Sequence, residues 1–198
     1  FQYRNFRYFW SGTLLASAGR WAETIVLSWL VIEMTGSPFL VGVAAAVRWI
    51  GYLLGPVFGT IADRYSKRNL VIILSVISVL YSFTLAFLVT TGMIQYWHIL
   101  AIGLVAGVAH AFDLPLRYAF PGDLVDKRNL TNAAALSTVA VDITAIVGPA
   151  TAGLLINYIG IGGVCWVMMS VYIVDVGAFW MLRGLPKVKT TAKQSTFS

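Results

Sequence analysis

The chain has 198 residues, of which 59% are hydrophobic and 11% are charged, and its mean hydropathy is +0.80. A soluble domain carries about 25% charged residues, so this composition excludes an ordinary soluble globule. The net charge of +6 would suggest a nucleic-acid partner for a soluble protein, but the placement of the basic residues points to a membrane instead.

Six long apolar runs recur along the chain, and each approaches the ~20 residues that an α-helix needs to cross a bilayer core of about 30 Å. They are residues 9–33, 39–62, 70–91, 99–120, 132–156 and 162–182. None alternates residue by residue over ~10 positions, as a transmembrane β-strand would. The sequence therefore predicts an all-α membrane protein with six transmembrane helices in residues 1–185, followed by the start of a cytoplasmic central linker in residues 186–198.

Outside these runs, lysine and arginine occur only in alternate connections. Residues 34–38, 92–98 and 157–161 contain neither. This partition is the positive-inside pattern. It predicts that both ends of the chain lie in the cytoplasm.

The first two runs contain ionisable side chains near the expected midplane. Such a group costs a few kcal/mol at the bilayer centre and normally faces a cavity or a partner, so it is a candidate for function. The first run carries Arg20 and Glu23, which are three residues apart and can also simply pair on one helix face. The second run carries Arg48.

Small residues in the second and fourth runs form stripes with a spacing of four. Gly51, Gly55 and Gly59 make one stripe, and Gly103 and Gly107 belong to the other. Stripes of this kind let neighbouring helices approach closely. They predict tight helix packing, which a moving interface would also need.

The connection between the second and third runs reads Gly59-Thr60-Ile61-Ala62-Asp63-Arg64-Tyr65-Ser66-Lys67-Arg68. A basic loop alone would only orient the neighbouring helices. A glycine four residues before an Asp-Arg pair, with two bases three and four residues after that arginine, is a far more restrictive pattern.

The fourth run carries His110, Asp113 and Arg117 at spacings of three and four, so they form a polar stripe on one helix face. The stripe suits a proton path, and it equally suits structural salt bridges. Both interpretations remain open for each residue.

The fifth and sixth runs add Asp142 near the midplane and Asp175 nearer the cytoplasmic side. The fifth run also contains Gly148-Pro149. Pro149 removes a backbone hydrogen bond and Gly148 permits a bend, so we expect this helix to kink or flex there. A Gly-Pro pair also occurs in the second run, which hints at two inverted three-helix repeats.

The connection at residues 59–68 resembles the signature cytoplasmic loop of the major facilitator superfamily, Gly-x-x-x-Asp-Arg-x-Gly-Arg-Arg, in the same place and on the same side. The resemblance implies a latch between two six-helix halves. Its gating residues would be Gly59, Asp63, Arg64, Lys67 and Arg68. Ser66 replaces the usual glycine and Lys67 an arginine, and lysine lacks the fork needed for a bidentate contact.

Further matches extend over essentially the whole chain and are similar to the macrolide-efflux and enterobactin-exporter branch of that superfamily. They are Gly36-Ser37-Pro38, Pro121 with Leu124-Val125, Asn132-Ala133 and Gly148-Pro149. Residues 148–153 also resemble the antiporter signature of the fifth helix, although Thr144 and Ala152 stand where glycines are expected. The resemblance implies the N-terminal six-helix half of a major facilitator fold in the bacterial inner membrane.

The resemblance further implies a secondary active transporter, most simply one for proton-coupled efflux of a small molecule of drug, macrolide or siderophore type. We expect the proton gradient as its energy source, and no cofactor, metal or nucleic acid. The partners would be the bilayer, the substrate and a C-terminal six-helix half. Candidates for substrate binding or proton coupling are Arg20, Glu23, Arg48, Asp113, Asp142 and Asp175. These candidates are four acidic and two basic side chains, and the excess of acidic side chains favours protons or cationic compounds as the transported species.

Two other functional classes also occur among helical membrane proteins. A channel or a non-transporting receptor would also be helical, but a channel requires a continuous polar pore, whereas these charges cluster near the midplane. An intramembrane enzyme is disfavoured because His98 and His110 are the only histidines and neither Gly-x-Ser-x-Gly nor His-Glu-x-x-His is present.

Overall fold

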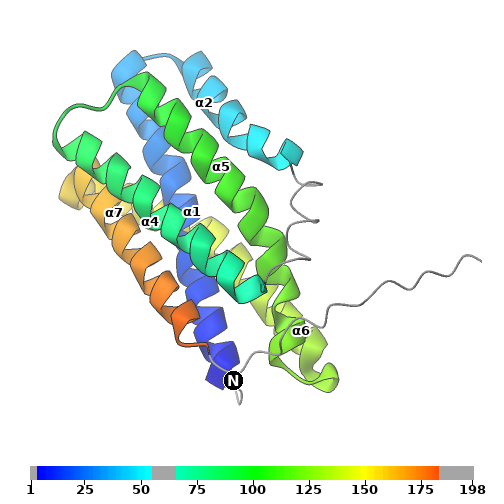
Figure 1. Ribbon diagram of the computed structural model, residues 1–198. Helices are drawn as coiled ribbons and strands as arrows, with labels where there is room; N and C mark the ends of the chain where they lie inside the picture. The colour runs from blue at the N-terminus through cyan, green and yellow to red at the C-terminus, as the bar shows by residue number, and fades with distance from the viewer. Residues whose placement is uncertain (1–3, 55–65, 183–198) are drawn as a thin grey trace, which may run out of the picture.

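The computed structural model describes residues 4–54 and 66–182, and these fold into a bundle of helices (Figure 1). In chain order the elements are α1 (Arg4–Thr35), α2 (Pro38–Ile50), the 3-10 helix η1 (Gly51–Leu54), α4 (Lys67–Thr90), α5 (Tyr96–Ala119), α6 (Pro121–Leu124), the 3-10 helix η2 (Lys127–Asn129) and α7 (Leu130–Trp180). The prediction of an all-helical fold is confirmed for the described residues.

The short uncharged connections are tight turns with recognisable capping groups. α1 is followed by Gly36, whose φ of 63° is accessible to glycine at little cost. The Ser37 hydroxyl then accepts a hydrogen bond from the backbone N–H of Leu40, and Pro38 occupies the first turn of α2. Ser66 caps α4 in the same way, through the backbone N–H of Asn69.

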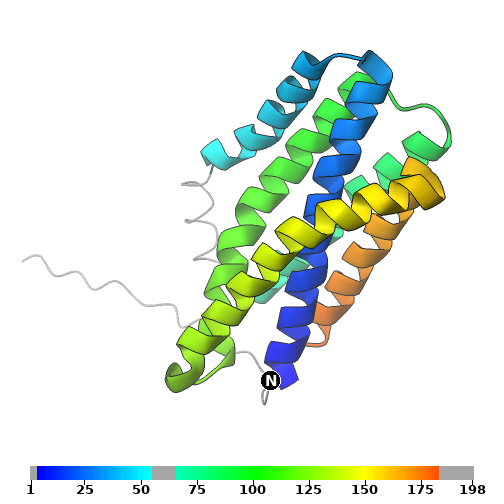
Figure 2. The same ribbon diagram turned by 180° about the vertical axis from the view of Figure 1, so that it is seen from behind.

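The last helix, α7, contains both of the last two predicted runs. Its backbone leaves the helical region at Gly160, where φ is 69° and ψ is 170°. We call residues 130–159 the first arm of α7 and residues 161–180 the second arm. The first arm crosses α1 and the second arm, orange, returns in the opposite direction (Figure 2).

Four described helices are long and apolar enough to cross a membrane: Asn5–Thr35, Lys67–Thr90, Tyr96–Ala119 and Leu130–Trp180. Pro38–Leu53 is a shorter apolar helix. The prediction of six separate spans is therefore met only in part within the described residues. One reason is that the fifth and sixth runs are two helices that join directly across the non-helical backbone at Gly160 and together make up the element α7. The other is that the second run leaves the described part of the chain after Leu54.

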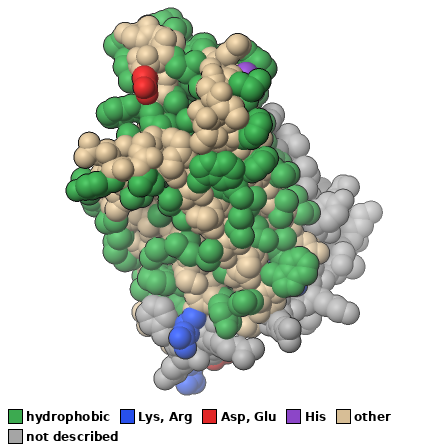
Figure 3. Space-filling model, turned by 90° about the vertical axis from the view of Figure 1, so that its left-hand side faces the viewer, with side chains coloured by type: hydrophobic (Ala, Val, Ile, Leu, Met, Phe, Trp, Pro, Cys, Tyr) green, Lys and Arg blue, Asp and Glu red, His purple; other side chains and the backbone are tan. Residues whose placement is uncertain are grey.

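Large apolar side chains cover much of the outside of the bundle. The face in Figure 3 is mostly hydrophobic or uncharged, and its few charged side chains lie toward the two ends. Phe39, Leu53 and Ile146 are more than three-quarters exposed, at 76%, 79% and 77%. A surface of this kind requires lipid or another apolar partner.

An aromatic cluster packs α1 and α5 against the end of α7. The ring of Phe9 stacks on Phe120 with centroids 5.4 Å apart, and Phe179 meets Phe120 edge-on at 5.6 Å. The guanidinium of Arg117 lies 4.8 Å from the centroid of Phe179, a cation–π distance. The cluster therefore places a buried arginine beside the second arm of α7.

The predicted tight packing is found at Gly51 and Gly107, where α2 meets α5, but not at Gly103, whose Cβ position meets nothing within 4 Å. A Cβ atom on Gly107 would overlap the carbonyl oxygen of Arg48, and one on Gly51 would overlap the backbone of Gly107 and Val108. Gly55 and Gly59 lie outside the described residues. The two helices are thus in backbone contact, which fixes Arg48 against α5.

Replacing Gly107 by alanine should lower the apparent melting temperature of the purified protein in detergent, because overpacking of this kind costs about 1–3 kcal/mol. Gly103→Ala is the matched control on the same helix, since a Cβ there meets nothing within 4 Å. Equal melting temperatures for the two variants would contradict the close contact of α2 with α5.

Candidate functional site

The structure brings five of the six predicted ionisable candidates into buried ion pairs and adds Arg117 to them. Three arginines and three carboxylates take part. They are Arg20, Arg48, Arg117, Glu23, Asp113 and Asp175. They form two adjoining groups, here called the Glu23 cluster and the Arg117 cluster.

The Glu23 cluster joins α1, α2, α4 and the second arm of α7. Oε1 of Glu23 accepts a hydrogen bond from Nη1 of Arg48 at 2.7 Å. Oε2 accepts from the hydroxyls of Tyr81 at 2.8 Å and Tyr172 at 3.2 Å. Glu23 is fully buried, and a buried carboxylate needs this complete set of partners. The local pair of Glu23 with Arg20, considered from the sequence, is replaced by these long-range contacts.

The Arg117 cluster lies beside it and joins α1, α4, α5 and the second arm of α7. Oδ2 of Asp113 accepts from Nη1 of Arg20 at 2.8 Å and from Nε of Arg117 at 2.6 Å. Arg117 also binds Asp175 with two hydrogen bonds of 2.7 and 3.2 Å, the bidentate geometry that makes such pairs strong. The Ser75 hydroxyl donates to Asp175 at 2.6 Å.

Two glycines of α1 make room for the second arm of α7 at these clusters. A Cβ on Gly12 would lie 2.9 Å from Oδ1 of Asp175, and one on Gly19 would lie 3.1 Å from the ring of Tyr172. Real Cβ atoms essentially never approach a neighbour within 3.0 Å, and a contact of 3.0–3.4 Å is tighter than nine in ten of those observed. The glycines thus allow each polar side chain of α7 to reach its partners.

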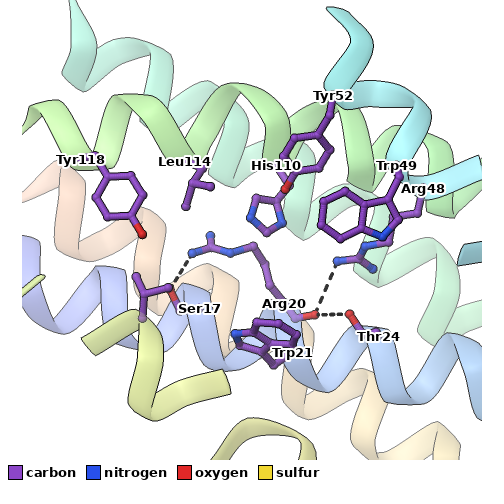
Figure 4. A pocket seen from close by; sticks show the side chains of 11 residues that line it. Ser17, Arg20, Trp21, Thr24, Arg48, Trp49, Tyr52, His110, Leu114 and Tyr118 are labelled. Atoms are coloured by element: carbon purple, nitrogen blue, oxygen red, sulfur yellow. Dashed lines mark hydrogen bonds between the residues drawn. The ribbon is translucent and has the colours of Figure 1, made fainter. Parts of the chain in front are cut away.

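A cavity of about 200 Å³ opens beside the clusters, between α1, α2, α5 and the first arm of α7 (Figure 4). It is lined by Ser17, Arg20, Trp21, Thr24, Arg48, Trp49, Tyr52, His110, Leu114, Tyr118 and Val141. A smaller cavity of about 100 Å³ shares Trp21, Thr24, Arg48 and Trp49 with it. Arginine side chains therefore lie between this cavity and the buried carboxylates.

The predicted stripe on α5 is divided by the structure. Asp113 and Arg117 belong to the ion-pair network, whereas His110 lines the cavity, where its ring centroid lies 5.8 Å from that of Tyr52. Oδ1 of Asp113 is buried and has no hydrogen-bond partner among the described residues. This oxygen can accept a hydrogen bond from a further donor.

Two predicted features of the fifth run lie away from the network. Asp142 is exposed on the first arm of α7 and takes part in neither cluster. Gly148 packs against α1, because a Cβ there would lie 2.9 Å from Cβ of Trp21. Pro149 lies inside the helix, while the residue with non-helical backbone angles is Gly160. A flexible bend at Gly148-Pro149 stays a prediction.

The predicted gating loop lies largely outside the described residues, which include neither Gly59, Asp63 nor Arg64. Lys67 begins α4. Arg68 donates from Nε to the carbonyl of Phe179 at 3.1 Å and from Nη2 to the carbonyl of Trp180 at 2.8 Å. The basic end of the loop is therefore attached to the C-terminal end of α7, where cations are stabilised by the helix dipole.

Sequence reasoning did not identify the uncharged members of the site, Tyr81, Tyr172 and Ser75. Each is a single polar residue inside an apolar run. Because a buried hydroxyl needs a hydrogen-bond partner, these positions could have been recognised from the sequence as candidates for contact with the buried charges. Within the described residues, no group of three or more His, Cys, Asp or Glu side chains is arranged to hold a metal ion.

Comparisons with known proteins agree with one another. The sequence profile of a family described as transmembrane secretion effector matches residues 1–196. The staphyloferrin A transporter of Staphylococcus aureus is 31% identical over 160 residues, which are 76% of this chain and 38% of that protein. Macrolide efflux protein A of Streptococcus pyogenes is 23% identical over 168 residues, which are 84% of this chain and 40% of that protein.

Among solved structures, the in meso crystal structure of the POT family transporter PepTSo matches with a TM-score of 0.77 and 16% sequence identity. The match covers 91% of this chain and 37% of that one. At this identity the likeness concerns the fold alone. The chain spans about two-fifths of the length of the curated relatives it matches.

Asp175→Asn should destabilise the folded protein strongly, because removal of one partner from a buried ion pair costs about 3–5 kcal/mol. We expect a lower melting temperature and a lower yield of monodisperse protein in size-exclusion chromatography. Asp142→Asn, on the same helix but exposed, is the matched control and should behave as wild type. A stable Asp175→Asn protein would show that the Arg117 cluster does not hold the second arm of α7 in place.

Proposed function

We propose, because the chain belongs to the transmembrane secretion effector family of the major facilitator superfamily, that it forms part of a secondary active transporter. The transporter would export a small molecule across the bacterial inner membrane in exchange for protons. The matched relatives are transporters rather than enzymes, so the intramembrane-enzyme alternative has no support. Since the chain spans 38% and 40% of two such relatives, we propose that a second helical bundle completes the transport site.

The observation that carries this proposal is the buried network of three arginines and three carboxylates beside a cavity. A charge inside a membrane protein is costly and commonly marks an ion or substrate pathway. Here each charged side chain forms an ion pair with a side chain of opposite charge. A channel would instead require a continuous polar lining. Pairs that can exchange partners suit a carrier that changes between two arrangements.

The proposed topology has six passes, with both ends in the cytoplasm and two inverted three-helix repeats. The reversal of α7 at Gly160 supports a fifth and a sixth pass within that helix. The confinement of basic residues to alternate connections supports the orientation. The repeat rests on the sequence pattern, since Gly55-Pro56 lies outside the described residues.

For proton coupling, Glu23 and Asp113 are the best-supported carboxylates. Glu23 pairs with Arg48, which also lines the cavity, so a ligand at the cavity can affect this pair directly. Asp113 keeps one buried oxygen without a hydrogen-bond partner among the described residues. Asp142 remains a candidate for contact with the proposed second bundle, because it is exposed in the described structure.

We also propose that the gating loop of Gly59, Asp63, Arg64, Lys67 and Arg68 acts as a latch between this helical bundle and the proposed second one, and that its Arg68 end is anchored on α7. The support is the contact of Arg68 with the last carbonyls of α7. A base fixed at this helix end would transmit a tilt of one helix to the other.

The transport proposal predicts saturable, gradient-driven flux by the full-length protein in inside-out proteoliposomes with an acidic lumen. The compounds to test are a macrolide and staphyloferrin A, because the matched relatives carry these names. At one proton per substrate, each pH unit supports about a tenfold accumulation, since a pH unit is worth about 1.4 kcal/mol. Flux that neither saturates nor responds to the gradient would instead indicate a channel.

The coupling proposal predicts that Glu23→Gln and Asp113→Asn each lower gradient-driven accumulation from about tenfold per pH unit toward no accumulation, because a carrier without its proton-binding carboxylate no longer draws on the gradient. Each variant also loses one partner of a buried ion pair, so flux is normalised to the amount of monodisperse protein that is reconstituted. Substrate exchange at equal pH on both sides should then persist, because exchange needs no net proton transfer. Glu33→Gln, which changes an exposed residue of the same helix, is the control. Wild-type accumulation in both variants would remove these carboxylates from the coupling mechanism.

A further inference from the structure

We propose that the cavity beside the ion pairs selects an organic anion, namely a molecule that carries a carboxylate on a flat, largely apolar body. The inference rests on the proposed function, because it takes this cavity to be part of the transport site. It goes further by naming the chemical class of the ligand.

The first argument is the direction of the charges. Arg20 and Arg48 line the cavity, whereas their carboxylate partners lie behind them. Glu23 is 0% exposed and Asp113 is 6% exposed. A ligand in the cavity therefore meets the guanidinium side of each pair.

The two guanidinium groups retain N–H donors that no described residue uses, and these are available to a ligand. A guanidinium has five N–H donors. Arg48 uses its two Nη atoms for Glu23 and, weakly at 3.5 Å, for the carbonyl of Arg20. Arg20 binds Asp113 and the Ser17 hydroxyl through single contacts of its Nη atoms. The remaining N–H groups match the two oxygens of a carboxylate.

The second argument is the lack of a carboxylate for a cation to meet. None of the described residues that line the cavity is Asp or Glu. His110 adds a further nitrogen donor or acceptor to the same wall. The sequence-level count of four acids against two bases favoured cations, but the folded arrangement reverses that preference because the acids are turned away from the cavity.

The third argument is the shape of the apolar walls. Trp21 and Trp49 project into the cavity with Leu114 nearby (Figure 4). Trp49 also packs on Tyr52, with ring centroids 4.7 Å apart. The volume of about 200 Å³ exceeds the roughly 150 Å³ of an engineered cavity that binds benzene. This space accommodates one flat ring system, and indole walls favour stacking with it.

The test uses three probes that share one ring system and differ in charge: naphthoate, naphthylmethylammonium and naphthylmethanol. Binding to the full-length protein in phosphatidylcholine nanodiscs is measured by isothermal titration calorimetry. We expect naphthoate to bind at least about tenfold more tightly than the other two, a difference of about 1.4 kcal/mol.

The Glu23→Gln and Arg48→Gln double variant removes one ion pair without leaving an unpaired charge. It should weaken naphthoate about tenfold while changing naphthylmethanol less than about twofold, so that a general loss of folding is distinguished from the loss of one contact. Trp49→Ala should weaken both probes. Arg128→Gln is the matched control, because Arg128 is exposed on η2 and does not line the cavity.

The inference is overturned if the ammonium or neutral probe binds as tightly as naphthoate, or if no probe binds. It is also overturned if phosphatidylglycerol in the nanodisc displaces naphthoate, since the site would then belong to an anionic lipid. Gradient-driven export of a cationic compound would contradict the anion selectivity inferred here and leave the proposed transport function intact. Naphthoate binding without any gradient-driven flux would support the anion site and contradict the proposed transport function.

Discussion

The bidentate pair between Arg117 and Asp175 is the interaction on which the arrangement of the bundle most depends. Both side chains are buried, and in apolar surroundings neither charge is tolerated without its partner. Arg117 reaches from α5 to the second arm of α7 and also holds Asp113. Asp113 in turn receives Arg20 of α1. One arginine thus connects three helices, and their relative positions are set by hydrogen-bond geometry as well as by packing.

Glycines make this charge network sterically possible. Apolar helices in lipid gain little by hydrophobic association with one another, so close van der Waals contact has to hold them together. Gly12 and Gly19 allow α1 to approach Asp175 and Tyr172, and Gly51 with Gly107 allows α2 to approach α5. The second contact places Arg48 where it reaches Glu23 at 2.7 Å. Packing and ion pairing therefore depend on the same few positions.

Much of the architecture was predictable from the sequence, because hydropathy and charge partition are properties of whole segments. The helical class and the candidate charges Arg20, Glu23, Arg48, Asp113 and Asp175 follow from this level of description. The partners of these charges do not follow, since a pair such as Arg117 with Asp175 joins positions 58 residues apart. The local spacing of Arg20 and Glu23 favoured a pair that the fold does not form. Asp142 looked equivalent to the other acids in sequence but is exposed, because the face that an isolated helix buries is decided by its neighbours.

The connection between the two clusters bears on the proposed exchange mechanism. Arg20 contributes its side chain to Asp113 and its carbonyl to Arg48, so it belongs to both. If a ligand anion draws Arg48 away from Glu23, the carboxylate keeps only the tyrosine hydroxyls of Tyr81 and Tyr172. Since breaking a buried ion pair is costly, an anion is held best by the N–H groups of Arg48 and Arg20 that their carboxylate partners leave unused, and both ion pairs then stay intact while the ligand is bound.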